Sequence, residues 1–91
     1  MADVRHNPSA GRFEAGSEAN PAHLDYRLEG AVAEIVHTEV PAEYQGQGLA
    51  GKLAAEALGW ARAQGFKVVP SCSYVAGFIA KRPEWQDLLT K

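Results

Sequence analysis

The sequence has little of several things that mark particular protein classes. A single cysteine rules out a disulfide within the chain and favours a reducing compartment. No run of about 20 apolar residues is present, so we expect no membrane-spanning segment, and no apolar signal core follows Met1. Cations do not outnumber acids, with 9 Lys and Arg against 11 Asp and Glu. The net charge of −2 disfavours non-specific nucleic-acid binding. We therefore expect a soluble, cytoplasmic protein with neither nucleic-acid nor membrane partners.

What is present suits one small globular domain. The chain has 91 residues, of which 46% are hydrophobic and 22% charged, close to the averages for globular proteins. A chain of this size buries roughly 60–70% of its unfolded surface, which is enough for a modest core. We expect a single domain over residues 1–91.

The first half of the chain shows the alternation of β-strands. Short strands are expected at residues 12–15 and 23–28, and Glu29-Gly30 has the composition of a hairpin turn. A longer strand is expected over residues 31–40. Strict alternation along it places four residues on one face: Ala33, Ile35, His37 and Glu39. The first ten residues are polar with a turn at Asn7-Pro8, and no strand is expected there.

The second half begins with a helical pattern. Apolar residues at a 3–4 spacing predict a helix over residues 48–64, although Glu56 falls irregularly on its apolar stripe, and Gly65 is a natural stop. A short strand over residues 66–70 follows, then a helix over 74–81 capped by Ser71 or Ser73, and a last turn from Pro83. The order is βββαβα. A crossover helix makes strands 31–40 and 66–70 parallel neighbours, so we expect a mixed α+β fold whose sheet is otherwise antiparallel.

A glycine-rich stretch without acids, Gln45 to Lys52, lies where the long strand gives way to the helix. The first N–H groups of a helix have no partner within it, and the helix dipole favours an anion there. Glycine lets the backbone approach such a ligand closely. This stretch is therefore a candidate phosphate cradle, with a simple glycine-rich helix cap as the plainer alternative.

Three phosphate motifs overlap on this stretch. Gly46, Gly48 and Gly51 satisfy the dinucleotide pattern G-x-G-x-x-G, but no acid lies near position 71, about 20 residues on. Gly46 to Lys52 also reads as G-x-x-x-x-G-K, but Leu53 stands where a P-loop needs Ser or Thr for Mg²⁺. The third reading is Gln45-x-x-Gly48-x-Ala50, which follows the end of a strand at Val40.

This third pattern resembles the acyl-CoA pyrophosphate loop of the GNAT acetyltransferase superfamily, Gln/Arg-x-x-Gly-x-Gly/Ala. With the element order, the chain looks like the small stand-alone members of that superfamily, without the first two helices of the GNAT fold. The resemblance covers nearly the whole chain. It is carried by residues 12–14, 24–28, 37–41, 45–52, 69–75 and 82–85.

The resemblance implies that acyl-CoA binds in a cleft where strands 31–40 and 66–70 splay apart, with no metal. The backbone of Val40 would contact the pantetheine arm, and the loop amides would hold the pyrophosphate. Ser73 stands about where many members use an asparagine for the pantetheine. The full set implied for acetyl-CoA is Val40, Gln45, Gly46, Gln47, Gly48, Leu49, Ala50, Gly51, Lys52 and Ser73.

Three residues are candidates for catalysis. The resemblance implies a catalytic role for Cys72, as acyl acceptor or as acid/base, and a helix start favours a reactive thiol there; a small buried side chain is the alternative. His37 or Glu39 could act as general base, directly or through a water, or form a plain surface pair. In many members of the superfamily a tyrosine protonates the leaving thiolate. That tyrosine has no clear counterpart in this sequence, because its place falls near Ala80.

Two functions stay open at this point. The first is an acetyl-CoA-dependent N-acyltransferase for an unknown amine, for which an open acceptor side would suit a protein or peptide. The second is a non-catalytic module that binds or senses acyl-CoA, which the missing general acid favours.

Overall fold

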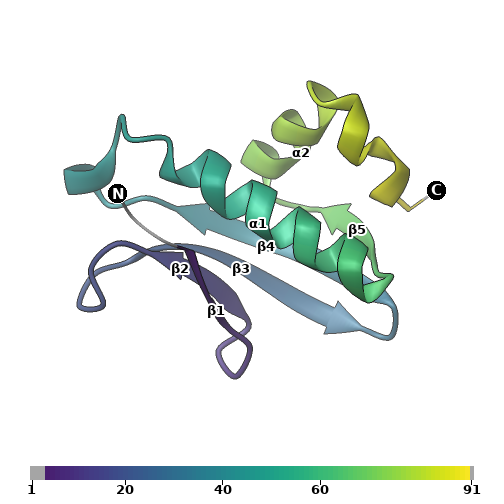
Figure 1. Ribbon diagram of the computed structural model, residues 1–91, viewed down its shortest axis with the longest axis horizontal. Coiled ribbons are helices and arrows are strands. Elements are labelled where there is room, and N and C mark those ends of the chain that lie inside the picture. The colour runs from purple at the N-terminus through teal and green to yellow at the C-terminus, as the bar shows by residue number, and fades with distance from the viewer. Residues whose placement is uncertain (1–3, 91) are drawn as a thin grey trace.

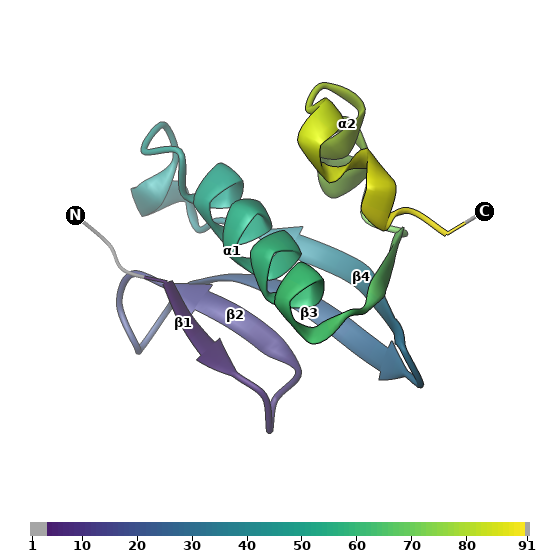
Figure 2. The same cartoon turned by 45° about the vertical axis from the view of Figure 1, so that its right-hand side comes forward.

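Five strands form one mixed sheet, and the two α-helices pack on the same face of it (Figure 1, Figure 2). The computed structural model describes residues 4–90. The elements in chain order are β1 (Val4–Asn7), β2 (Arg12–Ala15), β3 (Ala22–Glu29), β4 (Val32–Glu39), the 3₁₀ turn η1 (Ala42–Tyr44), α1 (Leu49–Gln64), β5 (Lys67–Pro70), α2 (Ser73–Ala80) and the 3₁₀ turn η2 (Pro83–Leu88).

The strands lie in sequence order across the sheet, β1-β2-β3-β4-β5. The first four pair antiparallel, and β4 and β5 pair parallel because α1 crosses over between them. The mixed α+β class and the parallel pair expected from the sequence are thus confirmed. Residues 4–41 contain strands and turns and no helix, so the other face of the sheet carries no helical layer from this part of the chain.

The sequence predicted three strands before the helix, but the structure has four, because β1 precedes the other three. Val4 and His6 of β1 pair with Ala15 and Phe13 of β2, and Val4 packs against the core whereas His6 stays exposed. The His6 ring stacks on Phe13 with 4.1 Å between ring centroids, and its Nε2 lies 2.6 Å from the hydroxyl of Tyr26. Histidine serves here as an aromatic packing residue, so a polarity pattern does not detect the strand.

A β-bulge in β4 overturns the expected alternation along that strand. Asp25 pairs with His37, whereas the next residue of β3, Tyr26, pairs with Ile35, so Val36 is an extra residue. Ile35 therefore faces the helices with Ala33, while His37 faces the opposite side. Thr38 pairs with the buried Leu24 and takes the helix-facing position instead. The single inserted residue decides which side chains of β4 meet α2.

Helix α1 covers the centre of the sheet and ends at Gly65, as the sequence predicts, but it begins at Leu49, one residue later than expected. Gly48 is the N-cap at φ 75° and Gly65 the C-cap at φ 78°. Glu56 is exposed, so it does not belong to the buried stripe. That stripe consists of Leu49, Leu53, Ala54, Ala57, Leu58 and Ala61. The irregularity at Glu56 is thus resolved, because Ala54 and Leu58 complete the core side while Trp60 packs against its margin.

The start of α2 also differs from the prediction. Its N-cap is Cys72, and no side-chain hydrogen bond caps the helix. Neither serine caps it, because the Ser71 hydroxyl donates to Glu34 Oε2 at 2.6 Å and Ser73 is already the first helical residue. This moves a thiol, rather than a hydroxyl, to the helix start.

Candidate functional site

The loop between β4 and α1 presents a set of backbone amides with no side-chain competitor. Gly46 and Gly48 adopt positive φ values of 88° and 75°, and a Cβ at either position would meet nothing within 4 Å. No side chain caps α1 at its N-cap Gly48. The N–H groups of Leu49, Ala50 and Gly51 therefore lack intrahelical partners and stay open at the positive end of the helix dipole. This is the local geometry of an anion site.

Gln45 connects the loop back to the end of β4. Its side-chain amide nitrogen donates to the carbonyl oxygen of Val40 at 3.2 Å. Val40 is partly buried and follows the last residue of β4 directly. The neutral glutamine thus braces the path from strand to loop, a role that an arginine donor could also fill.

Tyr44 anchors the same loop to the turn after β2, a contact that the sequence patterns missed. Its hydroxyl accepts a hydrogen bond from the Ser17 amide at 2.6 Å. A Cβ on Gly16 would lie 2.8 Å from Tyr44 Cζ, so the ring rests on the glycine itself. The only sequence signal for this contact is Gly16, whose φ of 87° favours glycine.

Strands β4 and β5 part at the bulge. Their paired residues end at Ile35 and Pro70, while β4 continues to Glu39. The Cys72 amide closes the paired region by donating to the Ile35 carbonyl at 3.0 Å. Beyond this point no described strand pairs with the β5-facing edge of β4. The backbone between Val36 and Glu39 can therefore bind an extended ligand along this edge.

Cys72 lies where the two strands separate and faces this stretch of β4. Its thiol donates to Oγ1 of Thr38 at 3.3 Å. Burial opposes ionisation of the thiol, but the Thr38 hydroxyl and the open amides of Val75 and Tyr74 favour the thiolate. The pKa of Cys72 consequently lies below the ordinary thiol value. The bulge creates this site, because it turns Thr38 toward the helices.

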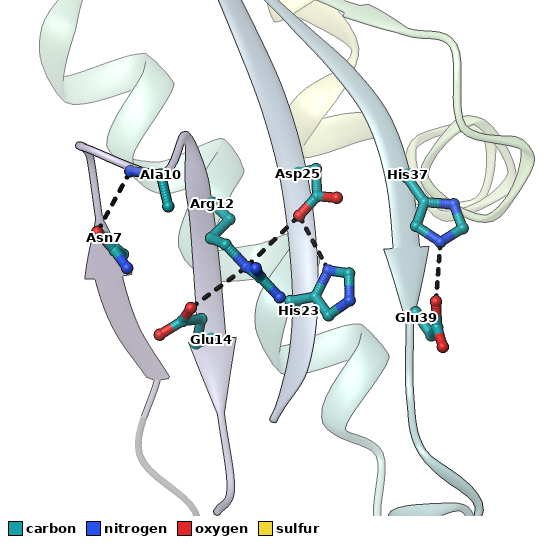
Figure 3. A network of polar contacts seen from close by, with 8 residues as sticks. All are labelled: Asn7, Ala10, Arg12, Glu14, His23, Asp25, His37 and Glu39. Atoms are coloured by element: carbon teal, nitrogen blue, oxygen red, sulfur yellow. Dashed lines mark hydrogen bonds and ion pairs between the residues drawn. The ribbon is translucent and has the colours of Figure 1, made fainter. Parts of the chain in front are cut away.

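His37 and Glu39 lie on the opposite face of the sheet. Their side chains are exposed, with His37 Nε2 3.2 Å from Glu39 Oε1. They belong to a polar surface that also includes the His23–Asp25 pair, whose atoms lie 2.9 Å apart (Figure 3). The structure thus brings His37 and Glu39 together, but Cys72 contacts their neighbour Thr38 rather than either of them.

The other predicted binding residues surround the start of α1. Lys52 is exposed on its first turn, and Ser73 is exposed on the first turn of α2. Gly51 faces α2, since a Cβ there would lie 3.5 Å from the hydroxyl of Tyr74. The first turns of α1 and α2 therefore lie side by side on one face of the sheet.

Two broader features of the described residues bear on chemistry. Within residues 4–90, no group of three or more His, Cys, Asp or Glu side chains is arranged to hold a metal ion. In the same range no helix has both the length and the apolar character to cross a bilayer.

Comparisons with known proteins agree with this architecture. The structure is similar to the NMR solution structure of a GCN5-like protein from Staphylococcus aureus assigned as a candidate N-acetyltransferase. The match has a TM-score of 0.78 and 28% identical residues, and it covers 97% of this chain and 87% of that one. The fold is therefore that of the GCN5-like acetyltransferases. A family model described as GCN5-related N-acetyltransferase matches residues 12–88. Because that match spans most of its length, the chain belongs to the GCN5-related N-acetyltransferase family.

Proposed function

We propose that this protein is an acetyl-CoA-dependent N-acyltransferase whose site runs from the loop after β4 to Cys72. Family membership supports N-acetyltransferase activity with acetyl-CoA as cosubstrate and an amine as acceptor. The observation that carries the proposal is the alignment of three features: open amides at the start of α1, the unpaired edge of β4, and the thiol of Cys72 where β4 and β5 part.

Each of these features suits a different part of acetyl-CoA. The amides of Leu49, Ala50 and Gly51 suit the pyrophosphate, because they lack partners within the helix and no side chain caps it, whereas the Gln45 and Gln47 amides already donate to the carbonyls of Ala42 and Tyr44. Lys52 adds a cation on the first turn of α1. The pantetheine arm contains amide groups and suits the edge of β4 near Val40, where backbone groups lack a strand partner. Ser73 is the first residue of α2, directly after Cys72, and carries the hydroxyl we assign to the pantetheine arm.

The reaction needs little from the protein beyond binding and proton transfer. A neutral amine attacks the thioester carbonyl, so a C–N bond forms, the C–S bond breaks, the amine loses a proton and the thiolate leaves. Holding both reactants in contact supplies most of the acceleration. We infer that a backbone amide near Val40 polarises the carbonyl.

Cys72 has two roles compatible with its environment. With a lowered pKa it gives up its proton readily to the departing CoA thiolate, or it accepts the acyl group itself as a thiolate and passes it to the amine. His37 and Glu39 supply a general base only on the open face of the sheet. An acceptor amine that uses them must therefore approach from that side, where residues 4–41 place no helix and a protein or peptide has room.

Transfer to peptides tests the proposal. The protein is incubated with acetyl-CoA and with peptides that offer either an α-amine or a lysine amine, and CoA thiol release and peptide mass are measured. We expect acetylated peptide with the wild type and with Ser71→Ala, a neighbouring change outside the site, and a loss of at least about tenfold with Cys72→Ala. Intact mass of the protein distinguishes the two roles of Cys72, because only an acyl acceptor carries an acetyl group.

A non-catalytic acyl-CoA-binding module is the second candidate. It is favoured by the separation of the acid–base groups, since His37 and Glu39 face away from Cys72 and Ala80 cannot donate a proton. In that case acetyl-CoA binds with the same affinity to the wild type and to Cys72→Ala, and no peptide is acetylated. Acetyl transfer that depends on Cys72 excludes this alternative.

A further inference from the structure

A hollow beside α2 continues from the proposed pyrophosphate loop, and of its lining the proposal above uses only Ser73. Its volume is about 390 Å³, within the range of small-molecule sites. It is lined by Ser73, Tyr74, Gly77, Phe78, Lys81 and Arg82. The hollow begins next to α1, because Tyr74 and Phe78 are also the side chains that a Cβ on Gly51 would meet. A ligand held by the loop amides can therefore extend into it without crossing the protein.

The charge of this hollow differs from that of the chain as a whole. The protein carries a net charge of −2, yet the hollow has two cations and no acid. Neither Lys81 nor Arg82 forms an ion pair with a residue between positions 4 and 90. Both cations are therefore available to an anion of a ligand.

The conformation of Arg82 prepares it for such a contact. Its guanidinium lies over the Phe78 ring with 3.9 Å to the ring centroid, and Nη1 donates to the Phe78 carbonyl at 3.4 Å. This uses one of five N–H donors and one face of the group. The rest stays free, on a side chain whose position is already fixed, so little rotamer freedom is lost on binding. Tyr74 adds an aromatic surface that is 43% exposed, one of two large apolar side chains so exposed among residues 4–90.

We propose that this hollow binds the 3′-phosphate end of coenzyme A, with Lys81 and Arg82 as the cations that contact the phosphate and Tyr74 as the surface for the nucleoside. The proposal rests on acyl-CoA binding at the adjacent loop. In CoA a single ribose separates the 3′-phosphate from the pyrophosphate, so a pyrophosphate on the amides near Gly51 brings the 3′-phosphate into this neighbourhood. Tyr74 and Lys81 lie about 10 Å apart along α2, the span of a nucleotide.

A comparison of CoA with 3′-dephospho-CoA tests the assignment. Both ligands carry the pyrophosphate and pantetheine, and only CoA carries the 3′-phosphate. By calorimetric titration at low salt, we expect the wild type to bind CoA about tenfold more tightly, as two charge-assisted contacts in a partly exposed site predict. The double variant Lys81→Gln/Arg82→Gln should bind both ligands with the affinity that the wild type has for dephospho-CoA.

The matched control is Arg27→Gln, which removes an exposed cation of β3 outside this hollow. It should keep the tenfold preference, which shows that the net charge of the protein is not the cause. Thermal unfolding of each variant establishes that it is folded. Equal binding of the two ligands by the wild type, or a preference that survives in the double variant, overturns the inference and leaves the acyl-CoA loop standing. Binding of neither ligand overturns both.

Discussion

The contact between Gly16 and Tyr44 should hold the proposed binding loop in place, and Gly16→Ala tests this. The new methyl group would lie 2.8 Å from Tyr44 Cζ, 2.9 Å from Cε2 and 3.1 Å from the hydroxyl. Atoms cannot remain at these separations, so the ring must move away from the turn. Such a movement also breaks the 2.6 Å hydrogen bond from the Ser17 amide. Because Tyr44 ends η1, directly before Gln45, the perturbation reaches the loop.

The unfolding free energy lost in Gly16→Ala has two parts, and the same substitution at Gly30 separates them. Gly16 has φ 87° and Gly30 has φ 60°, and a left-handed conformation costs an alanine about 1–2 kcal/mol at either position. At Gly30 nothing lies within 4 Å of the new Cβ, so strain is the whole effect. At Gly16 the overpacking adds about 1–3 kcal/mol. We therefore expect losses of about 2–5 kcal/mol for Gly16→Ala and about 1–2 kcal/mol for Gly30→Ala.

Urea unfolding gives the two free energies, and titration with CoA gives the consequence for the loop. Gly16→Ala should weaken CoA binding as well as stability, whereas Gly30→Ala should lower stability alone. If both variants lose the same free energy and bind CoA equally, Tyr44 does not anchor the loop and the reasoning fails.

Two further predictions concern titratable groups. Thr38→Val removes the hydroxyl that favours the thiolate and should raise the pKa of Cys72, seen as a shift of the alkylation rate profile toward higher pH; an unshifted profile would show that Thr38 has no such role. Burial lowers the pKa of His6 below 6.5. The neutral His6 ring therefore contributes its full stability above about pH 6.5, the unfolded-state pKa. This contribution is lost as the pH falls through the lower folded-state pKa. His6→Phe keeps an aromatic ring and should lose less unfolding free energy than the wild type between about pH 7.5 and pH 5.5; parallel losses would contradict this.

Much of the fold follows from local signals in the sequence. The crossover helix predicts the parallel pair, and Gly65 marks the end of α1 because a left-handed C-terminal cap favours glycine. The loop stretch from Gln45 to Lys52 is detectable for the same reason, since its composition meets a local backbone requirement. These features depend on residues close together in the chain, so sequence patterns capture them.

The features that the sequence did not predict depend on pairing between distant residues. The bulge at Val36 arises from the register of β4 against β3, and no residue in the strand marks it. The bulge turns the side chain of His37 away from the face of the sheet that carries Cys72. Thr38 lies on that face instead. Strand β1 was not predicted because His6 is polar by residue type but packs as an aromatic ring. That packing depends on Phe13 and Tyr26, which come from other strands.

The central claim is that the amides at the start of α1 bind acyl-CoA, and one calorimetric titration tests it directly. Gly48→Gln and Gly65→Gln are matched variants, because the two glycines cap opposite ends of α1 at φ 75° and 78° with nothing within 4 Å of a new Cβ. Both should lose similar stability, about 1–2 kcal/mol from the left-handed conformation.

Only Gly48→Gln places a side chain beside the open amides. We expect acetyl-CoA to bind the wild type and Gly65→Gln with similar affinity. It should bind Gly48→Gln at least about tenfold more weakly, because the glutamine side chain displaces the pyrophosphate from the loop amides. Equal affinities for the two variants, or no binding to the wild type, would contradict the central claim.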